Sequence, residues 1–363
     1  MKILLVRLRQ IGDVVFTTPA IRALHDRFPE ARITYVVEPA AAPVVERNTL
    51  LTQVVVAPRV AGLAGVWRDI KLGRLLRDDH YDIAIDFHGG PRASLLTWLS
   101  RARVRIGYDI PGRQWMYTRV VARPRELRAR HSVENQWDLL EPLDIPRPSR
   151  DAYPVEMSPS PHAAQAVASR IEAAGVSAGA PLVVVHVSAG NPFRRWPIES
   201  FGDVAAALVA RHQTVHVIIT SGPSEREAAS HVIAHARQQL SAGAQPRMVD
   251  CGDFSLAELR VLVDRAALYI GGDSGPMHIA ATSHVPMISL YGPTLPARSE
   301  PWRQSEFRSA AIEVSGLECR PCDQRVCAPG DFRCLLRIEP GQVIEMAERL
   351  VDLDAPKSKE VRK

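Results

Sequence analysis

The feature that most constrains the fold of this 363-residue chain is an alternation of short apolar runs with amphipathic stretches. In the first half, runs rich in β-branched and aliphatic residues predict strands at residues 2–8, 32–37, 53–57, 81–87 and 104–108. Helical spacing of apolar residues predicts helices at residues 14–28, 69–77, 91–100 and 132–143. Strands that alternate with helices are typical of βαβ units, so we expect a parallel, doubly wound sheet.

A second alternation follows a proline-rich passage, residues 144–161, which we interpret as a linker. After a helix at 162–174, the pattern predicts strands at 181–187, 214–220, 247–250, 267–271 and 286–291, and helices at 198–211, 224–239, 255–266, 276–283 and 340–353. We therefore expect a first Rossmann-like domain at 1–155, a linker and helix at 156–180, a second Rossmann-like domain at 181–350 and a flexible tail at 351–363. Because ligands bind beyond the carboxyl ends of parallel strands, the site is expected in a central cleft that the two domains face.

The chain has 45 Lys and Arg against 40 Asp and Glu, and an arginine-rich stretch spans residues 101–130. This stretch either attracts a phosphate-rich partner, such as an anionic membrane surface or a phosphorylated lipid, or forms a solvated surface. It lacks the motifs and interleaved aromatic residues of nucleic-acid-binding proteins, so no nucleic-acid partner is expected. No apolar run is long enough to span a membrane and no signal pattern opens the chain, so we expect a cytoplasmic protein.

Four of the five cysteines lie in one segment, at Cys319, Cys322, Cys327 and Cys334. In a cytoplasmic protein such a cluster indicates metal ligation more than a disulfide framework. The spacing differs from the usual pair of zinc knuckles. We therefore expect reduced, packed or redox-sensitive thiols, with a structural metal as the alternative.

The first predicted strand ends at a Gly-Asp corner, Gly12 and Asp13. Glycine favours a turn and aspartate favours a helix start, which alone explains both residues. Asp13 also lies at the strand end that meets the expected cleft, where a carboxylate can act as a general base. Both interpretations remain open on the residues alone.

Three corners in the second half carry groups suited to a diphosphate. After the strand at 181–187, small residues precede two arginines, whose forked donors neutralise phosphate unless they simply face solvent. The next corner has a glutamate in a first helical turn, where it complements the helix dipole or accepts from a sugar hydroxyl. The third, residues 268–282, turns a buried strand into a helix whose free N–H groups bind anions. The candidates are Ser188, Asn191, Arg194, Arg195, Glu225, Asp273, Ser274 and His278.

Three phosphate-binding corners in one domain favour a nucleotide-sugar or dinucleotide site. The dinucleotide glycine fingerprint is absent after the first strand, which weakens an oxidoreductase interpretation, and no P-loop lysine motif occurs. The D-x-D spacing occurs only at Asp352–Asp354, beside the tail. A diphosphate held by a carboxylate-bound metal is therefore not expected.

Taken in order, these corners resemble the ADP-heptose:lipopolysaccharide heptosyltransferases, glycosyltransferase family nine. The resemblance runs from Met1 to about Leu350 and rests on KILLVRLRQIGDVVFTTPAIRAL, HSVENQWDLLEPL, RRWP, GPSERE and GGDSGPMHIAAT followed by PMISLYGPT. The cysteine segment also looks like a region found in many members. The resemblance implies a GT-B fold and an inverting, metal-independent transfer of heptose from ADP-heptose to the inner core of lipopolysaccharide, with no cofactor.

The resemblance also implies roles for individual residues. Asp13 would deprotonate the acceptor hydroxyl, and Arg194, where the family most often has lysine, would pair with the donor phosphates. Ser188 would hold the diphosphate together with the backbone of the third corner, namely Asp273, Ser274, Gly275 and Met277. Glu225 would meet the nucleoside, and Asp273 or His278 the heptose or the phosphate edge. Arginines of the basic stretch would dock the anionic acceptor at the inner membrane surface: Arg119, Arg123, Arg125 and Arg128.

Two other functions are consistent with the sequence. One is another GT-B enzyme that uses a different donor or epimerises a nucleotide sugar. The other is a regulatory or nucleic-acid-binding module built on the arginine-rich stretch and a zinc-bound cysteine loop.

Overall fold

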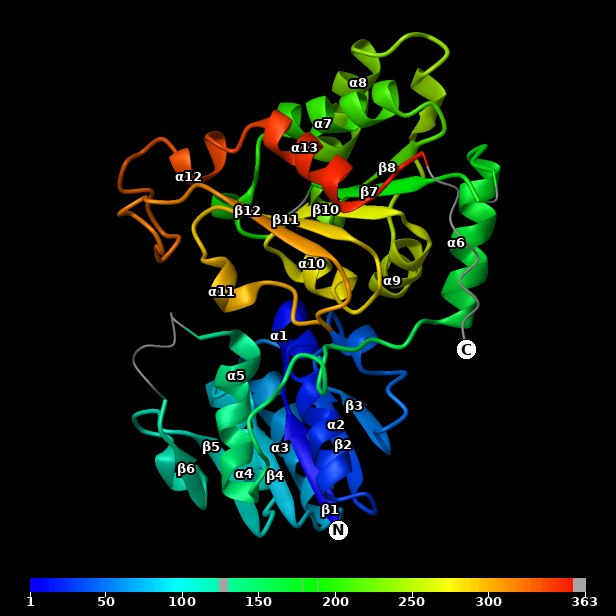
Figure 1. The fold of residues 1–363 in the computed structure, drawn as a ribbon. Coiled ribbons are helices and arrows are strands. Elements are labelled where there is room, and N and C mark those ends of the chain that lie inside the picture. Colours follow the sequence, from blue (N-terminus) through cyan, green and yellow to red (C-terminus); the bar gives the residue numbers. More distant parts are fainter. Residues whose placement is uncertain (124–129, 178, 188, 355–363) are drawn as a thin grey trace. The chain divides into compact units, whose positions relative to one another are not determined.

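The computed structural model describes residues 1–123, 130–177, 179–187 and 189–354, and the chain divides into two compact units. The first unit comprises Met1–Ser158 and Trp302–Gln304. The second comprises Pro159–Pro301 and the described residues from Ser305 onward. Each unit is an α/β domain with its own parallel sheet (Figure 1).

The first unit is built on six parallel strands in the order β3-β2-β1-β4-β5-β6. The order reverses at β1 and β4, and ligands of doubly wound sheets bind beyond the carboxyl ends of the strands that flank such a reversal. The strands are β1 (Lys2–Val6), β2 (Arg32–Val37), β3 (Gln53–Val56), β4 (Ile83–Asp86), β5 (Val104–Tyr108) and β6 (Arg119–Val121). The α-helices are α1 (Ile11–Val15), α2 (Thr18–Arg27), α3 (Gly62–Asp78), α4 (Pro91–Leu99) and α5 (Ser132–Trp137).

The second unit has six parallel strands in the order β12-β11-β10-β7-β8-β9, with the reversal at β7 and β10. Figure 1 shows α7, α8 and α13 on one face of this sheet and α9 and α10 on the other. The strands are β7 (Leu182–His186), β8 (His216–Thr220), β9 (Met248–Val249), β10 (Leu268–Gly272), β11 (Met287–Tyr291) and β12 (Ser309–Glu313). The α-helices are α6 (Pro161–Ala173), α7 (Ile198–Arg211), α8 (Arg226–Gln238), α9 (Leu256–Arg265), α10 (Gly275–Ala280), α11 (Pro296–Ser299), α12 (Arg333–Leu336) and α13 (Pro340–Leu350).

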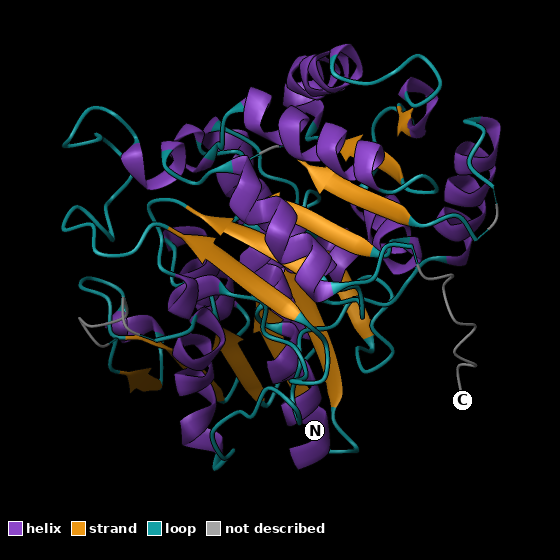
Figure 2. Cartoon of the chain, turned by 45° about the horizontal axis from the view of Figure 1, so that its top comes forward, coloured by secondary structure: helices purple, strands orange, loops and turns teal. Residues whose placement is uncertain are grey.

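The central strands of both sheets are buried on both faces. Four residues of β1, Ile3 to Val6, have no exposed surface, and β7, β10 and β11 are buried throughout. Helices lie on both faces of the sheets (Figure 2), which explains why these strands are continuous apolar runs rather than alternating ones. Since each buried aliphatic side chain contributes about 1.5–3 kcal/mol, the sheets are stable platforms for the loops at their carboxyl ends.

The predicted fold of two doubly wound α/β domains is confirmed, and the differences are local. The sequence pattern does not predict β6 or β12. The strand β6 has only three residues, and β12 is mostly exposed with small side chains, so neither gives an apolar run. Both are edge strands, where burial constrains the sequence least.

Several predicted helices have different bounds in the structure. The predicted helix at 132–143 is α5, which ends at Trp137 and continues as a 3₁₀ helix to Leu143, and the predicted helix at 340–353 is α13, which ends at Leu350. The predicted helix at 14–28 is two helices, because the hydroxyls of Thr17 and Thr18 donate to Val14 O and Val15 O at 2.7 and 2.8 Å, and Pro19 opens α2. The predicted helix at 69–77 is α3, which begins earlier, at Gly62.

The early start of α3 is hidden by its glycines, which have poor helix propensity. A Cβ atom at Gly65 would lie 2.0 Å from Val60 O, so this position requires glycine.

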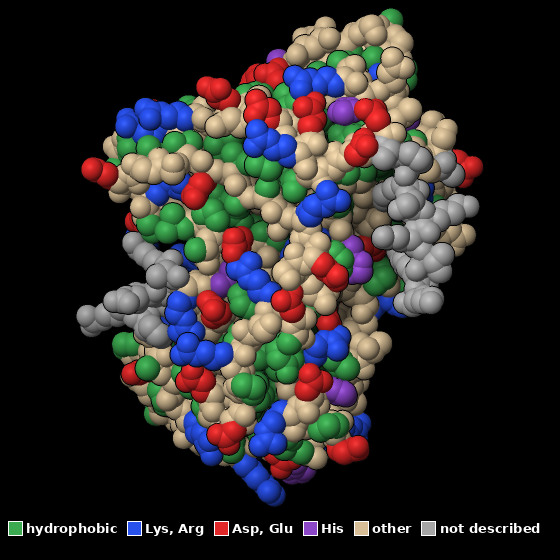
Figure 3. Space-filling view, viewed as in Figure 1, with side chains coloured by type: hydrophobic (Ala, Val, Ile, Leu, Met, Phe, Trp, Pro, Cys, Tyr) green, Lys and Arg blue, Asp and Glu red, His purple; other side chains and the backbone are tan. Residues whose placement is uncertain are grey.

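The described part of the chain contains no helix that is long and apolar enough to cross a membrane. On the face shown in Figure 3, basic and acidic side chains are interspersed. The excess positive charge is therefore not gathered into one block on that face.

Candidate functional site

Asp13 lies at the carboxyl edge of the first sheet, beside the reversal of strand order. Four residues separate the end of β1 from the short helix α1, and Asp13 is the third residue of this helix. Its carboxylate forms an ion pair with Arg7 and accepts a 3.5 Å hydrogen bond from Gln10 N. The side chain of Asp13 is 37% exposed, whereas that of Arg7 is 12% exposed. The carboxylate is thus held by a mostly buried cation while part of it stays accessible.

A second acid at this edge, Asp86, is fully buried and organises the turn after β4. Its Oδ1 accepts from His88 N at 2.9 Å and Gly89 N at 2.8 Å. Its Oδ2 accepts from Ser94 Oγ at 3.1 Å and Tyr117 OH at 2.7 Å. All of its acceptor capacity is used within the fold, so Asp86 supports the edge and does not react. Asp86 is not among the residues predicted from the sequence, although the Gly-Gly-Pro that follows it marks the same kind of strand-to-helix corner as at Gly12.

His88 connects this turn to the loop that precedes α1. Its Nδ1 lies 3.1 Å from Arg9 O, and Arg7 also donates to Phe87 O. Burial, and then the nearby Arg7 guanidinium, lowers the pKa of His88 below its ordinary value. The neutral form of the imidazole is therefore favoured, and the cation that pairs with Asp13 is Arg7.

The HSVENQW stretch packs against the same edge. It forms α5, which begins with a reciprocal capping arrangement between His131 and Glu134. Gln136 Nε2 donates to the backbone oxygen of Asp13 at 3.4 Å, and the rings of His131 and Phe16 meet edge to face at 5.2 Å. This stretch therefore braces α1.

The structure describes two of the four arginines predicted to bind the acceptor. Arg119 lies on the exposed edge strand β6 and donates to Pro142 O at 2.6 Å. The guanidinium of Arg123 lies 5.5 Å from the centre of the Tyr108 ring. Arg125 and Arg128 lie outside the described residues. Their common role in acceptor binding stays a prediction.

In the second unit, the loop after β7 brings together three of the residues predicted to bind the donor. Asn191 caps a short turn, because its Oδ1 accepts from Phe193 N at 3.0 Å. Arg194 is 30% exposed and points toward β10, whereas Arg195 pairs with Glu225 at 2.6 Å. The predicted Ser188 lies outside the described residues. The loop therefore directs Arg194 toward the end of β10 and Arg195 toward the end of β8.

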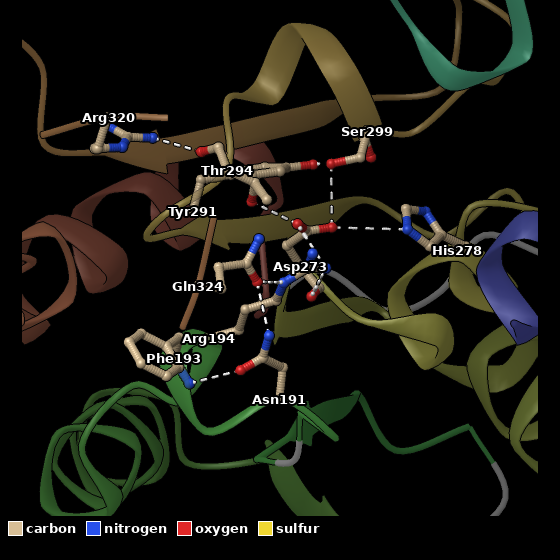
Figure 4. Close-up of polar contacts among 10 residues, drawn as sticks. All are labelled: Asn191, Phe193, Arg194, Asp273, His278, Tyr291, Thr294, Ser299, Arg320 and Gln324. Carbon is tan, nitrogen blue, oxygen red and sulfur yellow. Dashed lines mark hydrogen bonds and ion pairs between the residues drawn. The ribbon is translucent and has the colours of Figure 1, made fainter. Parts of the chain in front are cut away.

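Asp273, which directly follows β10, is 2% exposed and is the centre of a polar cluster (Figure 4). Its carboxylate accepts from Thr294 Oγ1 at 2.5 Å and Ser299 Oγ at 3.1 Å. Arg194 Nη1 lies 3.1 Å from one carboxylate oxygen, and His278 Nε2 lies 3.7 Å from the other. Since these partners use the carboxylate within the fold, the geometry favours a role for Asp273 in holding Arg194 rather than in contacting a sugar.

The other predicted residues of this corner lie around the start of α10. Ser274 is its N-cap residue and Gly275 its first residue. The side chains of Met277 and His278 are buried, so Met277 can offer a ligand only its backbone. Within the described part of the chain, the Ser274 hydroxyl has no hydrogen-bond partner. That hydroxyl is itself buried, so the corner offers an anion the helix-start N–H groups beside the Arg194 guanidinium.

The cysteine segment contributes two residues that the sequence analysis missed. Gln324 Oε1 accepts from Arg194 Nε at 2.6 Å and from Asn191 Nδ2 at 2.9 Å. Arg320 Nη2 donates to Thr294 O at 2.6 Å, behind the threonine that bonds Asp273 (Figure 4). No sequence motif marks Gln324, and only the proximity of its segment to the corner reveals it.

The cysteines themselves are free thiols in the structure. Among the described residues, which include all four cysteines, no group of three or more His, Cys, Asp or Glu side chains is placed to hold a metal ion. Phe332 N donates to Cys327 Sγ at 3.4 Å, and the Phe332 ring packs 5.4 Å from that of Phe193. The segment therefore packs against the donor corner through side chains other than the thiols.

A cavity of about 250 Å³ opens beside the carboxyl end of β8. Its polar lining includes Ser221, Asp250 and the ion pair between Arg226 and Asp253. The cavity lies beyond the end of β8, the strand that also leads to Glu225. This position suits a hydroxyl-rich group attached to a diphosphate bound at the β7 and β10 corners.

Comparisons with known proteins are consistent with this geometry. Residues 70–331 match the sequence model of glycosyltransferase family 9 (heptosyltransferase). Lipopolysaccharide heptosyltransferase 3 of Escherichia coli is 29% identical over 332 residues, which cover 86% of this chain and 89% of the relative.

Two solved structures are similar along nearly the whole chain. A family 9 glycosyltransferase from Veillonella parvula has a TM-score of 0.83 at 23% identity, with 96% of each chain covered. The ADP-heptose lipopolysaccharide heptosyltransferase II of Escherichia coli has a TM-score of 0.77 at 20% identity, with 96% of this chain and 98% of that chain covered. The fold is therefore of the GT-B type, as predicted.

Proposed function

This chain belongs to glycosyltransferase family 9, and we propose that it transfers heptose from ADP-heptose to the inner core of lipopolysaccharide. The heptosyltransferase relatives support the transfer of heptose to lipopolysaccharide, and a solved heptosyltransferase of the same fold is named for ADP-heptose as donor. The observation that carries the proposal is the different chemistry at the two reversals of strand order. The first sheet presents an accessible carboxylate, Asp13, and the second presents an anion site around Arg194.

The donor site is proposed at the corners after β7 and β10. Breaking the bond between heptose and ADP leaves negative charge on the diphosphate. Arg194 and the start of α10 supply the opposite charge, and arginine stays protonated throughout. We propose that this stabilisation replaces a metal ion. Ser274 and the backbone of Gly275 to Met277 complete the diphosphate site, and Ser188 is retained as a predicted ligand.

The nucleoside is proposed to occupy the cavity beside β8. The serine and carboxylate side chains that line the cavity are suited to form hydrogen bonds with the hydroxyls of a ribose. Glu225, predicted to meet the nucleoside, is paired with Arg195. We propose that this pair closes the site between the nucleoside and the diphosphate, so that Arg195 supports binding through Glu225.

Asp13 is the proposed general base. Inversion requires the acceptor oxygen to attack the anomeric carbon on the face opposite the leaving ADP, so the base cannot belong to the ADP site. The Asp13 carboxylate is accessible, and Arg7 fixes its orientation. A carboxylate in this position takes the proton as the acceptor hydroxyl forms its new bond to carbon.

The acceptor is anionic and carried on a lipid, and we propose that it is reached at the cytoplasmic surface of the inner membrane. Arg119 and Arg123 lie on the first unit and are suited to its phosphates and acidic sugars. Arg125 and Arg128 remain predicted contributors to the same contact.

The test is to incubate the enzyme with ADP-heptose and defined truncated core acceptors and to look for an added heptose by mass spectrometry. Parallel reactions contain UDP- and GDP-sugars, and a further reaction contains EDTA. We expect a heptose adduct from ADP-heptose alone, unaffected by EDTA. An adduct from another donor would replace the proposed donor, and loss of product in EDTA would contradict transfer without a metal.

A further inference from the structure

The first two turns of α3 expose an apolar surface that the proposed reaction does not use. Leu63 is 80% exposed, Val66 50% and Trp67 66%. Their spacing of three and four residues places them on one face of the helix. A tryptophan and two aliphatic side chains exposed together are uncommon on a surface that meets only water.

The opposite face of α3 packs against α4, so the apolar face points away from the domain. Gly65, Gly73 and Leu76 are the buried residues of α3. At Gly73 the packing is so close that a Cβ atom would lie 2.5 Å from Leu99 of α4. This close packing fixes the rotation of α3 and therefore the direction in which Leu63 and Trp67 point.

Basic residues continue the exposed face along the helix. Lys71 and Arg74 follow Trp67 at helical spacing on the same face, and Arg68 is also exposed. The acid within this stretch, Asp69, is paired with Arg92 at 2.9 Å. The outer face of α3 is therefore apolar at its start and positively charged beyond it, the arrangement of a helix that lies on an anionic bilayer.

The position of this face in the fold connects it to the acceptor side of the reaction. Because α3 follows β3 and leads into β4, it begins at the carboxyl edge of the sheet, the edge that carries Asp13. Arg92 ties the start of α3 to that edge: it pairs with Asp69 and with Glu38 at 2.8 Å, and it donates to Ala57 O at 3.2 Å. A membrane in contact with Leu63 and Trp67 would thus lie beside the edge where the acceptor hydroxyl must arrive.

We propose that the first two turns of α3 rest on an anionic phospholipid bilayer. Leu63, Val66 and Trp67 enter the interface, with the indole at headgroup level. Lys71 and Arg74 lie over anionic headgroups. The contact presents a lipid-anchored saccharide to the edge that carries Asp13, so this inference rests on the proposed function for the identity of the acceptor.

Vesicle sedimentation tests the contact without any substrate. The full chain is mixed with phosphatidylcholine vesicles with or without phosphatidylglycerol. We expect binding only to the anionic vesicles, weakened about tenfold or more by the double variant Leu63→Ser and Trp67→Ser. A matched variant in the second unit, Leu336→Ser, exposed by 58% in the native chain, is expected to bind as the native chain does.

The charged part of the face is tested separately. Lys71→Glu with Arg74→Glu is expected to weaken binding to anionic vesicles about tenfold or more. Arg349→Glu, a basic residue of the second unit with a 73% exposed side chain, is the control and is expected to leave binding unchanged. Thermal unfolding of every variant establishes that it is folded.

Transfer assays separate this inference from the proposed function. With a lipid-anchored acceptor in vesicles, the Leu63 and Trp67 variant is expected to lose about tenfold in rate, and with a deacylated, water-soluble acceptor it is expected to keep the native rate. A native chain that binds vesicles through α3 but transfers no heptose would overturn the proposed function and leave the contact standing. Equal vesicle binding by the native chain and all variants would overturn the proposed contact with the bilayer. The contact would also be overturned if the native chain self-associates without lipid and the Leu63 and Trp67 variant does not.

Discussion

The carboxyl edges of the two sheets each carry an aspartate paired with an arginine, and the two pairs are built in opposite ways. At the first edge the arginine is the buried partner, because Arg7 is 12% exposed and Asp13 37%. At the second edge the acid is buried, because Asp273 is 2% exposed and Arg194 30%. In each pair, the buried partner is the one that fixes the orientation, and the accessible partner is the one that can meet a substrate.

This difference explains how similar folds within one chain can serve different parts of one reaction. An accessible carboxylate held by a cation is suited to taking a proton, and an accessible guanidinium held by a carboxylate is suited to binding phosphate. The surroundings agree with this division. Asp273 bonds to two hydroxyls in addition to Arg194, whereas Asp13 receives one long backbone hydrogen bond.

The largest effect is expected for Asp13→Asn, which removes the base but keeps the shape of the side chain. We expect kcat to fall about 10²–10⁴-fold, the usual contribution of a general base. Steady-state kinetics with ADP-heptose and a truncated acceptor measure it. Asp86→Asn provides the contrast: its carboxylate is fully used within the fold, so it should lower Tm more than Asp13→Asn does. A native kcat for Asp13→Asn would remove Asp13 from the chemistry.

The next effect is expected on the stability of the second unit. Asp273→Asn leaves Arg194 without its ionic partner and disturbs a buried cluster, which should lower the free energy of unfolding by about 2–3 kcal/mol. Calorimetric unfolding measures the change. Glu345→Gln removes an acid from a surface pair with Arg349, with side chains 70% and 73% exposed, and should change stability by less than about 0.5 kcal/mol. Equal effects of the two changes would contradict the assigned role of Asp273.

A smaller effect is expected at Gln324, which orients Arg194 from the cysteine segment. Gln324→Ala should raise the KM for ADP-heptose about fivefold with little change in kcat, because one neutral hydrogen-bonding partner of the arginine is lost. Gln324→Glu, which keeps the acceptor oxygen, should retain the position of Arg194. The neighbouring Arg325→Ala, at an exposed position, is the control. If kcat falls while KM stays constant, Gln324 does not act through donor binding.

The smallest expected effect is a dependence of the free energy of unfolding on pH, which arises in the second unit. His186 ends β7, and burial lowers its pKa to about 4. In the unfolded chain the pKa is near 6.5, so between these values the unfolded state binds the extra proton and acid favours unfolding. The contribution of His186 to the free energy of unfolding should be nearly constant above pH 6.5 and should fall by about 1 kcal/mol between pH 6.5 and 5.5. His186→Asn should flatten this slope, and an unchanged slope would assign it to another group.

Much of the fold follows from periodicity, because both sheets have fully buried central strands that are continuous apolar runs. The elements that the hydrophobic pattern does not predict are those whose sequence is less constrained by burial. The edge strands β6 and β12 bury little. In α3, Gly65 is required by the close approach of Val60 and Gly73 by packing on α4. Glycine lowers helix propensity, so the local pattern and the tertiary structure disagree there.

The sequence predicts those parts of the candidate site that lie at recognisable strand-to-helix turns. Gly-rich strand ends locate Asp13, Arg194 and Asp273, because glycine and helix-capping residues mark such turns. Which partner of an ion pair is buried depends on contacts far along the chain, such as that of Thr294 with Asp273, and no local pattern encodes it. Gln324 was missed for the same reason, since it lies 130 residues from Arg194 along the chain.

The division of labour between the two edges is tested most directly by calorimetric titration of ADP into two variants, Asp13→Asn and Arg194→Gln. We predict that Asp13→Asn binds ADP with the native Kd and that Arg194→Gln binds it about tenfold more weakly or worse, since a charged hydrogen bond to phosphate is lost. A large loss of ADP affinity in Asp13→Asn, or native affinity in Arg194→Gln, would contradict the account.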